Sequence, residues 1–221
     1  MNKKLAIFDL DGTLLNTIAD LGCACNYALA KHGFPLHSDE EYPHLVGNGI
    51  NKLIERALPM GHKTTDDIML IREDFVPYYN LHKCDLTQPY QNIPEAISAL
   101  KKEGWLLAVA SNKYQSAAEE IVNHYFPSMF DLIYGEIGNV PRKPDPTIVD
   151  NILNELKVCK SRDTVFYIGD SDVDVLTAKN AALPCVACSW GFCAKTTLQQ
   201  LTPEYIIDNP QQITEILCNQ K

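Results

Sequence analysis

Residues 5–13 of this chain, LAIFDLDGT, decide both its fold and the place of its chemistry. The apolar run at 5–10 predicts a buried strand, and Asp9 and Asp11 stand at the end of that strand. Because side chains alternate along a strand, residues two apart point to one side, so these two carboxylates are expected to lie together. Like charges at the carboxyl end of a parallel strand indicate either a divalent-cation site or a proton-transfer task.

Four further apolar runs predict strands of the same kind, at 106–110, 132–134, 165–168 and 184–187. Helical patterns with an apolar stripe accompany these runs, at 94–103, 115–124, 146–157 and 173–182. Strands that alternate with helices predict an α/β fold, in which a parallel, Rossmann-like sheet carries helices on both faces.

The segment 15–86 departs from this alternation, because its apolar residues follow helical periods and form no continuous strand-like run. Three apolar stripes begin at Ile18, Ile50 and Ile68. The sequence therefore predicts a helical domain at 15–86, inserted into a discontinuous α/β core formed by 1–14 and 87–221. The polar, proline-containing stretch HKCDLTQPYQN suits an exposed connection back to that core.

Composition narrows the class of protein. The chain has 221 residues, a formal net charge of −9 and 46% hydrophobic content, enough for a full buried core. No basic run of the kind that attracts nucleic acid is visible, no apolar run approaches the ~20 residues of a membrane helix, and no signal-peptide pattern precedes the first strand. We therefore expect a cytoplasmic protein that binds neither nucleic acid nor membrane; the oligomeric state stays open.

The eight cysteines are expected to be mostly reduced, since a core of this size does not need disulfides. Cys185 and Cys188 have CxxC spacing, but no second CxxC or His pair accompanies them as a zinc site would require. We interpret both as small buried side chains.

Candidate phosphate ligands follow two of the predicted strands. Ser111 and Asn112 come directly after the run 106–110 and before a helix, and Thr13 follows the aspartate pair. Hydroxyl, amide and helix N-terminal N–H groups donate to phosphate oxygens, although Ser and Asn are also ordinary helix caps. Lys143, in PRKPDP, is held by neighbouring prolines; it could neutralise a phosphate and the aspartates, or simply be solvated.

A second acidic group follows the fourth predicted strand. Asp170, Asp172 and Asp174 cluster at a helix start, where the helix dipole alone favours acids. Asp170 and Asp174 are four residues apart and share a helix face, so both can meet a metal held by Asp9 and Asp11, whereas Asp172 points elsewhere. Because these signals fall at strand ends on one edge of the sheet, the sequence predicts one pocket in which the acids and the phosphate ligands converge.

FDLDGTL, the strand-terminal Ser111, Lys143 before a proline, and GDSDVD match in order the four motifs of haloacid dehalogenase superfamily phosphatases. The chain resembles that family over nearly its whole length, and the helical insertion is similar to the family's α-helical cap. The resemblance implies a phosphatase in which Ser111 and Lys143 hold the phosphoryl group.

The resemblance also implies roles for the acids. Asp9 would be the nucleophile that forms an aspartyl-phosphate, and Asp11 the acid/base that protonates the leaving oxygen and then activates water. Mg²⁺ would be bound by the Asp9 carboxylate, the Asp11 backbone carbonyl and Asp170, with Asp174 helping directly or through water. A dehalogenase generally lacks the acid at Asp11, so dehalogenation is not expected.

The substrate is expected to be a small phosphorylated metabolite. The VGNGI segment at 46–50 resembles the cap segment of phosphoglycolate phosphatase-like members, although it can equally be a helix start, and Asn48 and Lys52 are its candidate substrate-selecting residues. Two alternatives stay open: a phosphosugar mutase similar to β-phosphoglucomutase, which would return the phosphoryl group to a sugar, and a noncatalytic binding protein on the same fold.

Overall fold

The structure, a computed structural model, describes residues 2–219 and divides the chain into two compact units. One unit joins the chain up to Leu15 with the chain from Pro89 onward, and the other is Asn16–Gln88. The segments that pass between them, β2 (Leu15–Asn16) and β3 (Gln88–Pro89), pair as a two-stranded sheet.

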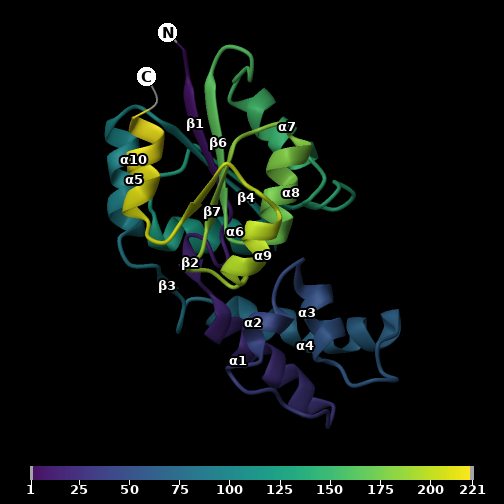
Figure 1. Ribbon diagram of the computed structural model, residues 1–221. Coiled ribbons are helices and arrows are strands. Elements are labelled where there is room, and N and C mark those ends of the chain that lie inside the picture. Colours follow the sequence, from purple (N-terminus) through teal and green to yellow (C-terminus); the bar gives the residue numbers. More distant parts are fainter. Residues whose placement is uncertain (1, 220–221) are drawn as a thin grey trace. The chain divides into compact units, whose positions relative to one another are not determined.

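The larger unit is built on a six-stranded sheet in the order β5-β4-β1-β6-β7-β8, and every neighbouring pair is parallel (Figure 1). The strands are β1 (Lys4–Phe8), β4 (Leu106–Tyr114), β5 (Leu132–Glu136), β6 (Thr164–Gly169), β7 (Cys185–Cys188) and β8 (Tyr205–Ile207). The predicted α/β class with a parallel sheet is confirmed. The sixth strand, β8, was not expected, because three residues give too short an apolar run to stand out.

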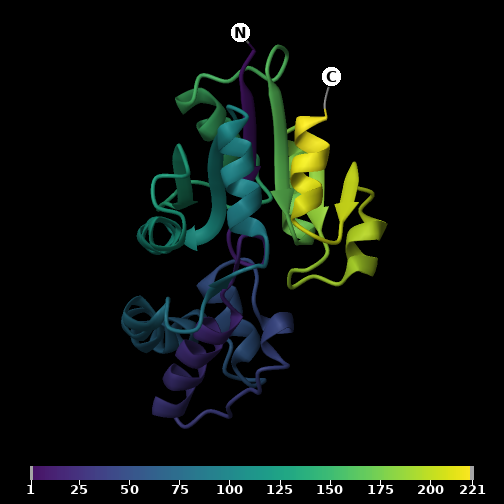
Figure 2. The same cartoon turned by 90° about the vertical axis from the view of Figure 1, so that its left-hand side faces the viewer.

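The central strands are apolar throughout because both faces of the sheet are covered. Leu5 and Ile7 of β1 are fully buried in one core cluster with residues of α7 and α8, and the alternate residues Ala6 and Phe8 are equally buried. Two views show α5 and α10 on one face of the sheet and α7 and α8 on the other (Figures 1 and 2). The helices of this unit are α5 (Ile93–Lys102), α6 (Gln115–Tyr125), α7 (Thr147–Glu155), α8 (Asp172–Asn180), α9 (Lys195–Gln200) and α10 (Gln211–Cys218).

The smaller unit is helical. It contains α1 (Ile18–Lys31), α2 (Tyr42–Leu45), α3 (Ile50–Ala57) and α4 (Thr65–His82). Helix α1 buries Cys25 and Leu29 of the stripe that begins at Ile18, and α4 buries Phe75 and Tyr79 of the stripe that begins at Ile68. The start of α4 is fixed by a capping box, in which Thr64 and Asp67 exchange side-chain and backbone hydrogen bonds.

One buried acid ties the two ends of this helical unit together. Asp20, in the first turn of α1, accepts hydrogen bonds from the backbone N–H groups of Leu86 and Thr87, and the Thr87 hydroxyl donates to it at 2.8 Å. A 2% exposed carboxylate needs such donors, because a buried charge without partners is unstable.

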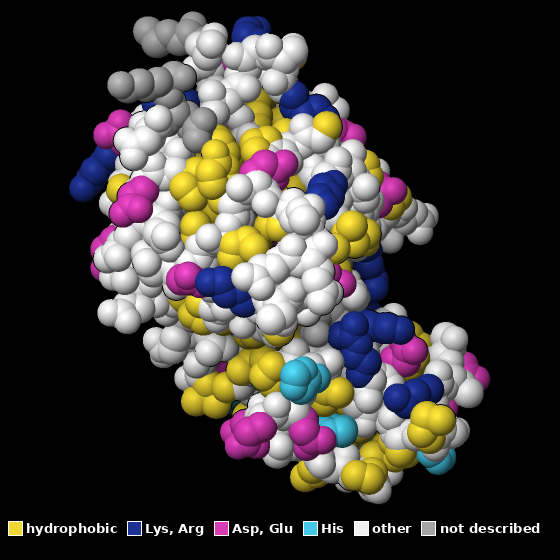
Figure 3. All heavy atoms as spheres, in the orientation of Figure 1, with side chains coloured by type: hydrophobic (Ala, Val, Ile, Leu, Met, Phe, Trp, Pro, Cys, Tyr) yellow, Lys and Arg dark blue, Asp and Glu magenta, His cyan; other side chains and the backbone are white. Residues whose placement is uncertain are grey.

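Charged side chains of both signs are interspersed on the face drawn in Figure 3. None of the described helices combines the length and the apolar character that crossing a membrane requires. Cys185 and Cys188 lie buried in β7 as free thiols, in agreement with their interpretation as small core residues.

Candidate active site

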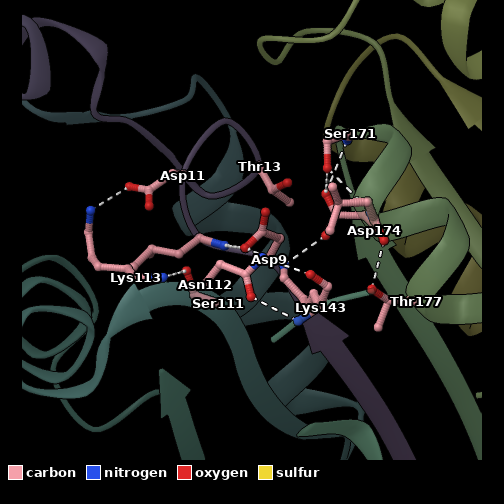
Figure 4. Close-up of polar contacts among 12 residues, drawn as sticks. Asp9, Asp11, Thr13, Ser111, Asn112, Lys113, Lys143, Ser171, Asp174 and Thr177 are labelled. Carbon is pink, nitrogen blue, oxygen red and sulfur yellow. Dashed lines mark hydrogen bonds and ion pairs between the residues drawn. The ribbon is translucent and has the colours of Figure 1, made fainter. Parts of the chain in front are cut away.

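The carboxyl ends of three neighbouring strands, β4, β1 and β6, carry polar side chains on one edge of the sheet (Figure 4). Asp9 follows the last residue of β1, Ser111 lies within β4, and Asp170 follows β6. All three are at least nine-tenths buried. In open α/β sheets this is the edge at which ligands bind, so the buried polar groups lie where chemistry is expected.

Asp9 is held by donors from its own strand end and from a distant loop. Its Oδ1 accepts a hydrogen bond of 2.7 Å from the Leu10 N–H and lies 2.8 Å from the Lys143 ammonium. Burial raises the pKa of Asp9 well above its usual value, the Asp174 and Asp170 carboxylates raise it further, and Lys143 opposes them. The carboxylate therefore sits in a site that favours added positive charge.

Lys143 is the central cation of the site. Its Nζ lies 2.8 Å from Oδ1 of Asp174 and 3.1 Å from the hydroxyl of Tyr167, in addition to its contact with Asp9. Burial favours the neutral amine, but the carboxylates of Asp174 and Asp9 outweigh it and raise the pKa of Lys143 well above its usual value. Lys143 is therefore a fixed ammonium, not the solvated lysine considered as the alternative.

Asn112 fixes the loop that presents Lys143. Its side-chain Nδ2 donates to the Lys143 carbonyl at 3.1 Å, and its Oδ1 accepts from the Lys143 N–H at 2.9 Å. We expected a phosphate contact from this amide, whereas the structure shows both of its polar atoms on the Lys143 backbone. Such paired hydrogen bonds set the position of the loop, and with it the position of the ammonium.

Asp170 is enclosed by donors. The Thr13 hydroxyl donates to its Oδ1 at 2.8 Å, and the Phe192 N–H donates to its Oδ2 at 2.8 Å. Burial and the Asp174 carboxylate raise the pKa of Asp170 to about 7, although these hydrogen bonds oppose the shift. The hydroxyl of Thr13, expected on phosphate, thus contacts a neighbouring acid in the structure.

Asp174 is fixed by the start of α8. Its Oδ2 accepts from the Ser171 hydroxyl at 2.5 Å and from the Ser171 N–H at 3.1 Å, which together with the return bond to the Asp174 N–H forms a capping box. Burial would raise the pKa of Asp174, but Lys143 and the Ser171 hydrogen bonds hold it below its usual value. Asp172, two residues earlier, is exposed, as expected.

Glycines let the backbone approach these acids closely. A Cβ on Gly12 would lie 2.3 Å from Oδ2 of Asp170, and one on Gly191 would lie 2.2 Å from the same atom. Gly12 also has a φ of +88°, which L side chains rarely adopt. Any larger residue at either position would displace Asp170.

The acids fit a divalent cation. Asp9, Asp170 and Asp174 each offer a buried carboxylate oxygen, and these three atoms lie within 4.8 Å of one another. Hard oxygen donors of this kind suit Mg²⁺. Burial and the neighbouring carboxylates raise the pKa values of Asp9 and Asp170 despite the Lys143 ammonium, so an added cation would favour the ionised carboxylates.

Lys113 is a site residue that our sequence reasoning did not select. Its Nζ lies 3.0 Å from Oδ1 of Asp11, and its side chain is only 4% exposed. Strand β4 continues to Tyr114, beyond the run 106–110, so Lys113 belongs to the strand and not to a loop before the helix. Its place directly after Ser111 and Asn112 was the one available signal.

Asn48 and Lys52 lie in the helical unit, on either side of the start of α3. Asn48 has a φ of 64° between two glycines that also have positive φ. Lys52 forms an exposed pair with Glu55, with 2.7 Å between Nζ and Oε2. The segment 46–50 is therefore a tight turn that leads into a helix.

Comparisons with known proteins agree with this fold. The family model described as "Haloacid dehalogenase-like hydrolase" matches residues 6–188. A phosphoglycolate phosphatase of Cereibacter sphaeroides is 34% identical over 184 residues, which cover 80% of this chain and 81% of that protein. One of Vibrio parahaemolyticus is 29% identical over 221 residues, which cover 97% and 96%.

Solved structures extend the likeness to three dimensions. A crystal structure from Lactobacillus delbrueckii subsp. bulgaricus has a TM-score of 0.91 at 32% identity and covers 98% of this chain and 99% of that one. The crystal structure of a predicted phosphoglycolate phosphatase from Haemophilus somnus has a TM-score of 0.89 at 28% identity and covers 98% of both chains.

Proposed function

Because this chain belongs to the haloacid dehalogenase-like hydrolases, we propose that it is a Mg²⁺-dependent phosphatase that transfers the phosphoryl group of a small metabolite to Asp9 and then to water. The observation that carries the proposal is the convergence of Asp9, Lys143, Asp170 and Asp174 in one buried cluster. A hydrolase that transfers phosphoryl groups needs a nucleophile, a cation for the phosphoryl oxygens and a metal site, and this cluster supplies all three.

In the first step, a carboxylate oxygen of Asp9 attacks phosphorus and the bond between phosphorus and the leaving oxygen breaks. Asp11 gives its proton to that leaving oxygen, so that an alcohol departs. Asp9 is suited to attack because the Lys143 ammonium and the Leu10 N–H fix its carboxylate. The product of this step is an aspartyl-phosphate on Asp9.

In the second step, Asp11, now a carboxylate, takes a proton from a water molecule as that water attacks phosphorus. The bond between phosphorus and Asp9 breaks, inorganic phosphate leaves, and Asp11 is again protonated. Asp9, the Asp11 backbone carbonyl, Asp170 and Asp174 are the groups that we propose hold Mg²⁺. The bound metal supplies positive charge to the phosphoryl oxygens in both steps.

Ser111 and Lys143 are the side chains that we propose contact the phosphoryl oxygens. Ser111 is 2% exposed, and its Oγ accepts from the Lys113 N–H at 3.2 Å, which fixes the hydroxyl near the end of β4. Thr13 and Asn112 then act by holding Asp170 and the Lys143 loop, the groups with which their side chains are in contact.

We propose phosphoglycolate or a similarly small phosphorylated acid as the substrate, because relatives at 34% and 29% identity carry the name phosphoglycolate phosphatase. The helical unit Asn16–Gln88 would serve as a cap, with Asn48 and Lys52 as its substrate-selecting residues. The free thiols of the cysteines agree with a cytoplasmic enzyme.

A turnover screen over phosphorylated metabolites with Mg²⁺ tests the activity, and we expect phosphoglycolate among the better substrates. The covalent step is tested with the Asp11→Asn variant and 4-nitrophenyl phosphate, whose leaving anion needs no acid in the first step; this variant should accumulate the aspartyl-phosphate because it lacks the base for the second step. Acid quench, borohydride reduction and peptide mass analysis should place the reduced acyl group at Asp9. Label at another residue would overturn the assignment of the nucleophile.

A further inference from the structure

The nucleophile and the acid/base of the proposed mechanism each lie beside a different buried lysine. Lys143 lies 2.8 Å from Asp9, the nucleophile, and Lys113 lies 3.0 Å from Asp11, the acid/base. The two lysines come from different elements, the loop before α7 and the strand β4, and Figure 4 shows them reaching the two aspartates separately. Lys113 has no part in the steps described so far.

The burial of Lys113 calls for an acidic partner. Its side chain is 4% exposed, and removing an ammonium from water costs several kcal/mol unless a carboxylate compensates. Asp11 supplies that carboxylate. The aspartate is itself more open to solvent, at 19% exposure, so packing alone constrains it less than it constrains Asp9.

The backbone around Lys113 is fixed closely. The Lys113 N–H donates to Oγ of Ser111 at 3.2 Å, and a Cβ on Gly135 of β5 would lie 2.6 Å from the Lys113 carbonyl oxygen. Gln115, the first residue of α6, also binds β5, since its Nε2 donates to the Ile133 carbonyl at 2.8 Å. A lysine presented from so rigid a frame can set the orientation of the group that it contacts.

We propose that Lys113 is a positioning residue, which holds the carboxyl group of Asp11 in the orientation needed for proton transfer. This inference rests on the proposed function. An acid/base must face the leaving oxygen in the first step and water in the second, and misplacement by about 1 Å can cost about 100-fold in rate. Oδ1 of Asp11 can accept the Lys113 hydrogen bond whether or not the carboxyl group carries a proton, so the contact serves both steps.

The test compares Lys113→Met and Lys113→Arg with the wild-type enzyme on esters that differ in their need for an acid. Ethyl phosphate and phosphoglycolate release alkoxides that must be protonated, whereas 4-nitrophenyl phosphate releases a stable anion. We expect Lys113→Met to lower kcat/KM by about 10- to 100-fold for both alkyl esters and by less than about 3-fold for the aryl ester. Inhibition by inorganic phosphate should stay within about 2-fold, and Lys113→Arg should recover most of the rate, because it restores a cation near Asp11.

A second arm uses Asp11→Asn as the background. Adding Lys113→Met to it should change the alkyl rate by less than about 2-fold, because a residue that acts through Asp11 has nothing left to position. The double variant has neither Lys113 nor the Asp11 carboxylate that Lys113 pairs with. It can therefore be compared with Asp11→Asn even if Lys113→Met alone does not fold. Equal losses on alkyl and aryl esters, a further loss in the Asp11→Asn background, or a loss confined to phosphoglycolate and absent for ethyl phosphate would each overturn the proposal.

These outcomes are distinct from failure of the proposed function. If the wild-type protein with Mg²⁺ hydrolysed none of the three esters, the phosphatase assignment itself would be wrong. If the wild-type protein hydrolysed the esters and Lys113→Met did so at the same rates, only the role of Lys113 would be wrong.

Discussion

The ammonium of Lys143 lies 2.8 Å from Oδ1 of Asp9 and 2.8 Å from Oδ1 of Asp174, inside a cluster of three buried carboxylates that also includes Asp170. Beside burial, which is the larger cause, the excess of negative charge raises the pKa values of Asp9 and Asp170. It also means that the metal-free protein carries electrostatic strain at the place where Mg²⁺ would bind. Activity and stability should therefore respond differently to changes at this site.

Asp9→Asn should abolish turnover but not folding. We expect the phosphatase rate to fall by at least about 10³-fold, because an amide cannot form the acyl phosphate. In the absence of Mg²⁺, the thermal unfolding midpoint should stay the same or rise, since one of the three repelling carboxylates is gone. Turnover assays and thermal unfolding in a chelator measure the two effects. Asp172→Asn is the matched control, because Asp172 is an exposed aspartate in the first turn of α8, near Asp174, and it should change neither.

Lys143→Met should lower both activity and stability. The variant leaves Asp9 and Asp174 without their ammonium, and removal of one partner of a buried ion pair typically costs about 3–5 kcal/mol. Denaturant unfolding without metal measures this cost. Lys160→Met, which removes a 40% exposed lysine 3.8 Å from Asp150, should cost less than about 1 kcal/mol. An equal loss in both variants would contradict the role given to Lys143.

The stability of the metal-free protein should fall as the pH rises from about 4 to about 7. The pKa of Asp170 is raised to about 7, above its usual value of 3.8, so the folded state binds more protons than the unfolded state between these values. Stability then decreases with pH at up to about 1.4 kcal/mol per unit, and the raised pKa of Asp9 acts in the same direction. Above pH 7 the contribution of Asp170 is lost.

Denaturant unfolding in a chelator at several pH values measures this slope, and Asp170→Asn should flatten it. Saturating Mg²⁺ should also remove it, because a bound cation favours the ionised carboxylates, so stabilisation by the metal should grow as the pH rises to 7. A chelated wild-type protein that gains stability between pH 5 and 7 would contradict the electrostatic description of the site.

Much of the fold could be predicted from the sequence because the deciding elements carry strong local patterns. Buried central strands such as β1 and β6 are nearly continuous apolar runs, and the helices that flank them have clear apolar stripes. The three-residue strand β8 and the four-residue helix α2 have no such pattern. The continuation of β4 through Lys113 and Tyr114 was not predicted either, because the polar residues before them suggest that the strand ends, although the backbone stays extended.

The acids of the site were predictable for a related reason, since strand ends in a parallel sheet meet at one edge. The contacts of the supporting side chains were not. The Asn112 side chain turns to the Lys143 backbone because of the path of a loop 31 residues later in the chain. Likewise, the pairing of Lys113 with Asp11 joins a residue of β4 to one that follows β1, far away in the sequence. The local sequence does not determine contacts between side chains that lie far apart along the chain.

Gly191, in the loop after β7, should be essential for metal binding, because it lets this loop approach Asp170 closely. A Cβ on Gly191 would lie 2.2 Å from Oδ2 of Asp170 and 2.3 Å from its Cβ, so Gly191→Ala must displace the loop or the carboxylate. Displacement also breaks the hydrogen bond from the Phe192 N–H to Oδ2 of Asp170. We expect Mg²⁺ activation to weaken by about 10-fold or more, as for other losses of support around a metal ligand.

Titration of phosphatase activity with Mg²⁺ measures this effect, and Gly104→Ala is its control. Gly104 has no atom within 4 Å of an added Cβ, although its φ of +77° makes alanine strained. The control should therefore lose about 1 kcal/mol of stability but keep its Mg²⁺ requirement. If Gly191→Ala kept the wild-type Mg²⁺ requirement while folding normally, the loop would have no part in holding Asp170. A higher Mg²⁺ requirement in Gly191→Ala, with no change in Gly104→Ala, would instead show that metal affinity depends on the close approach of this loop to Asp170.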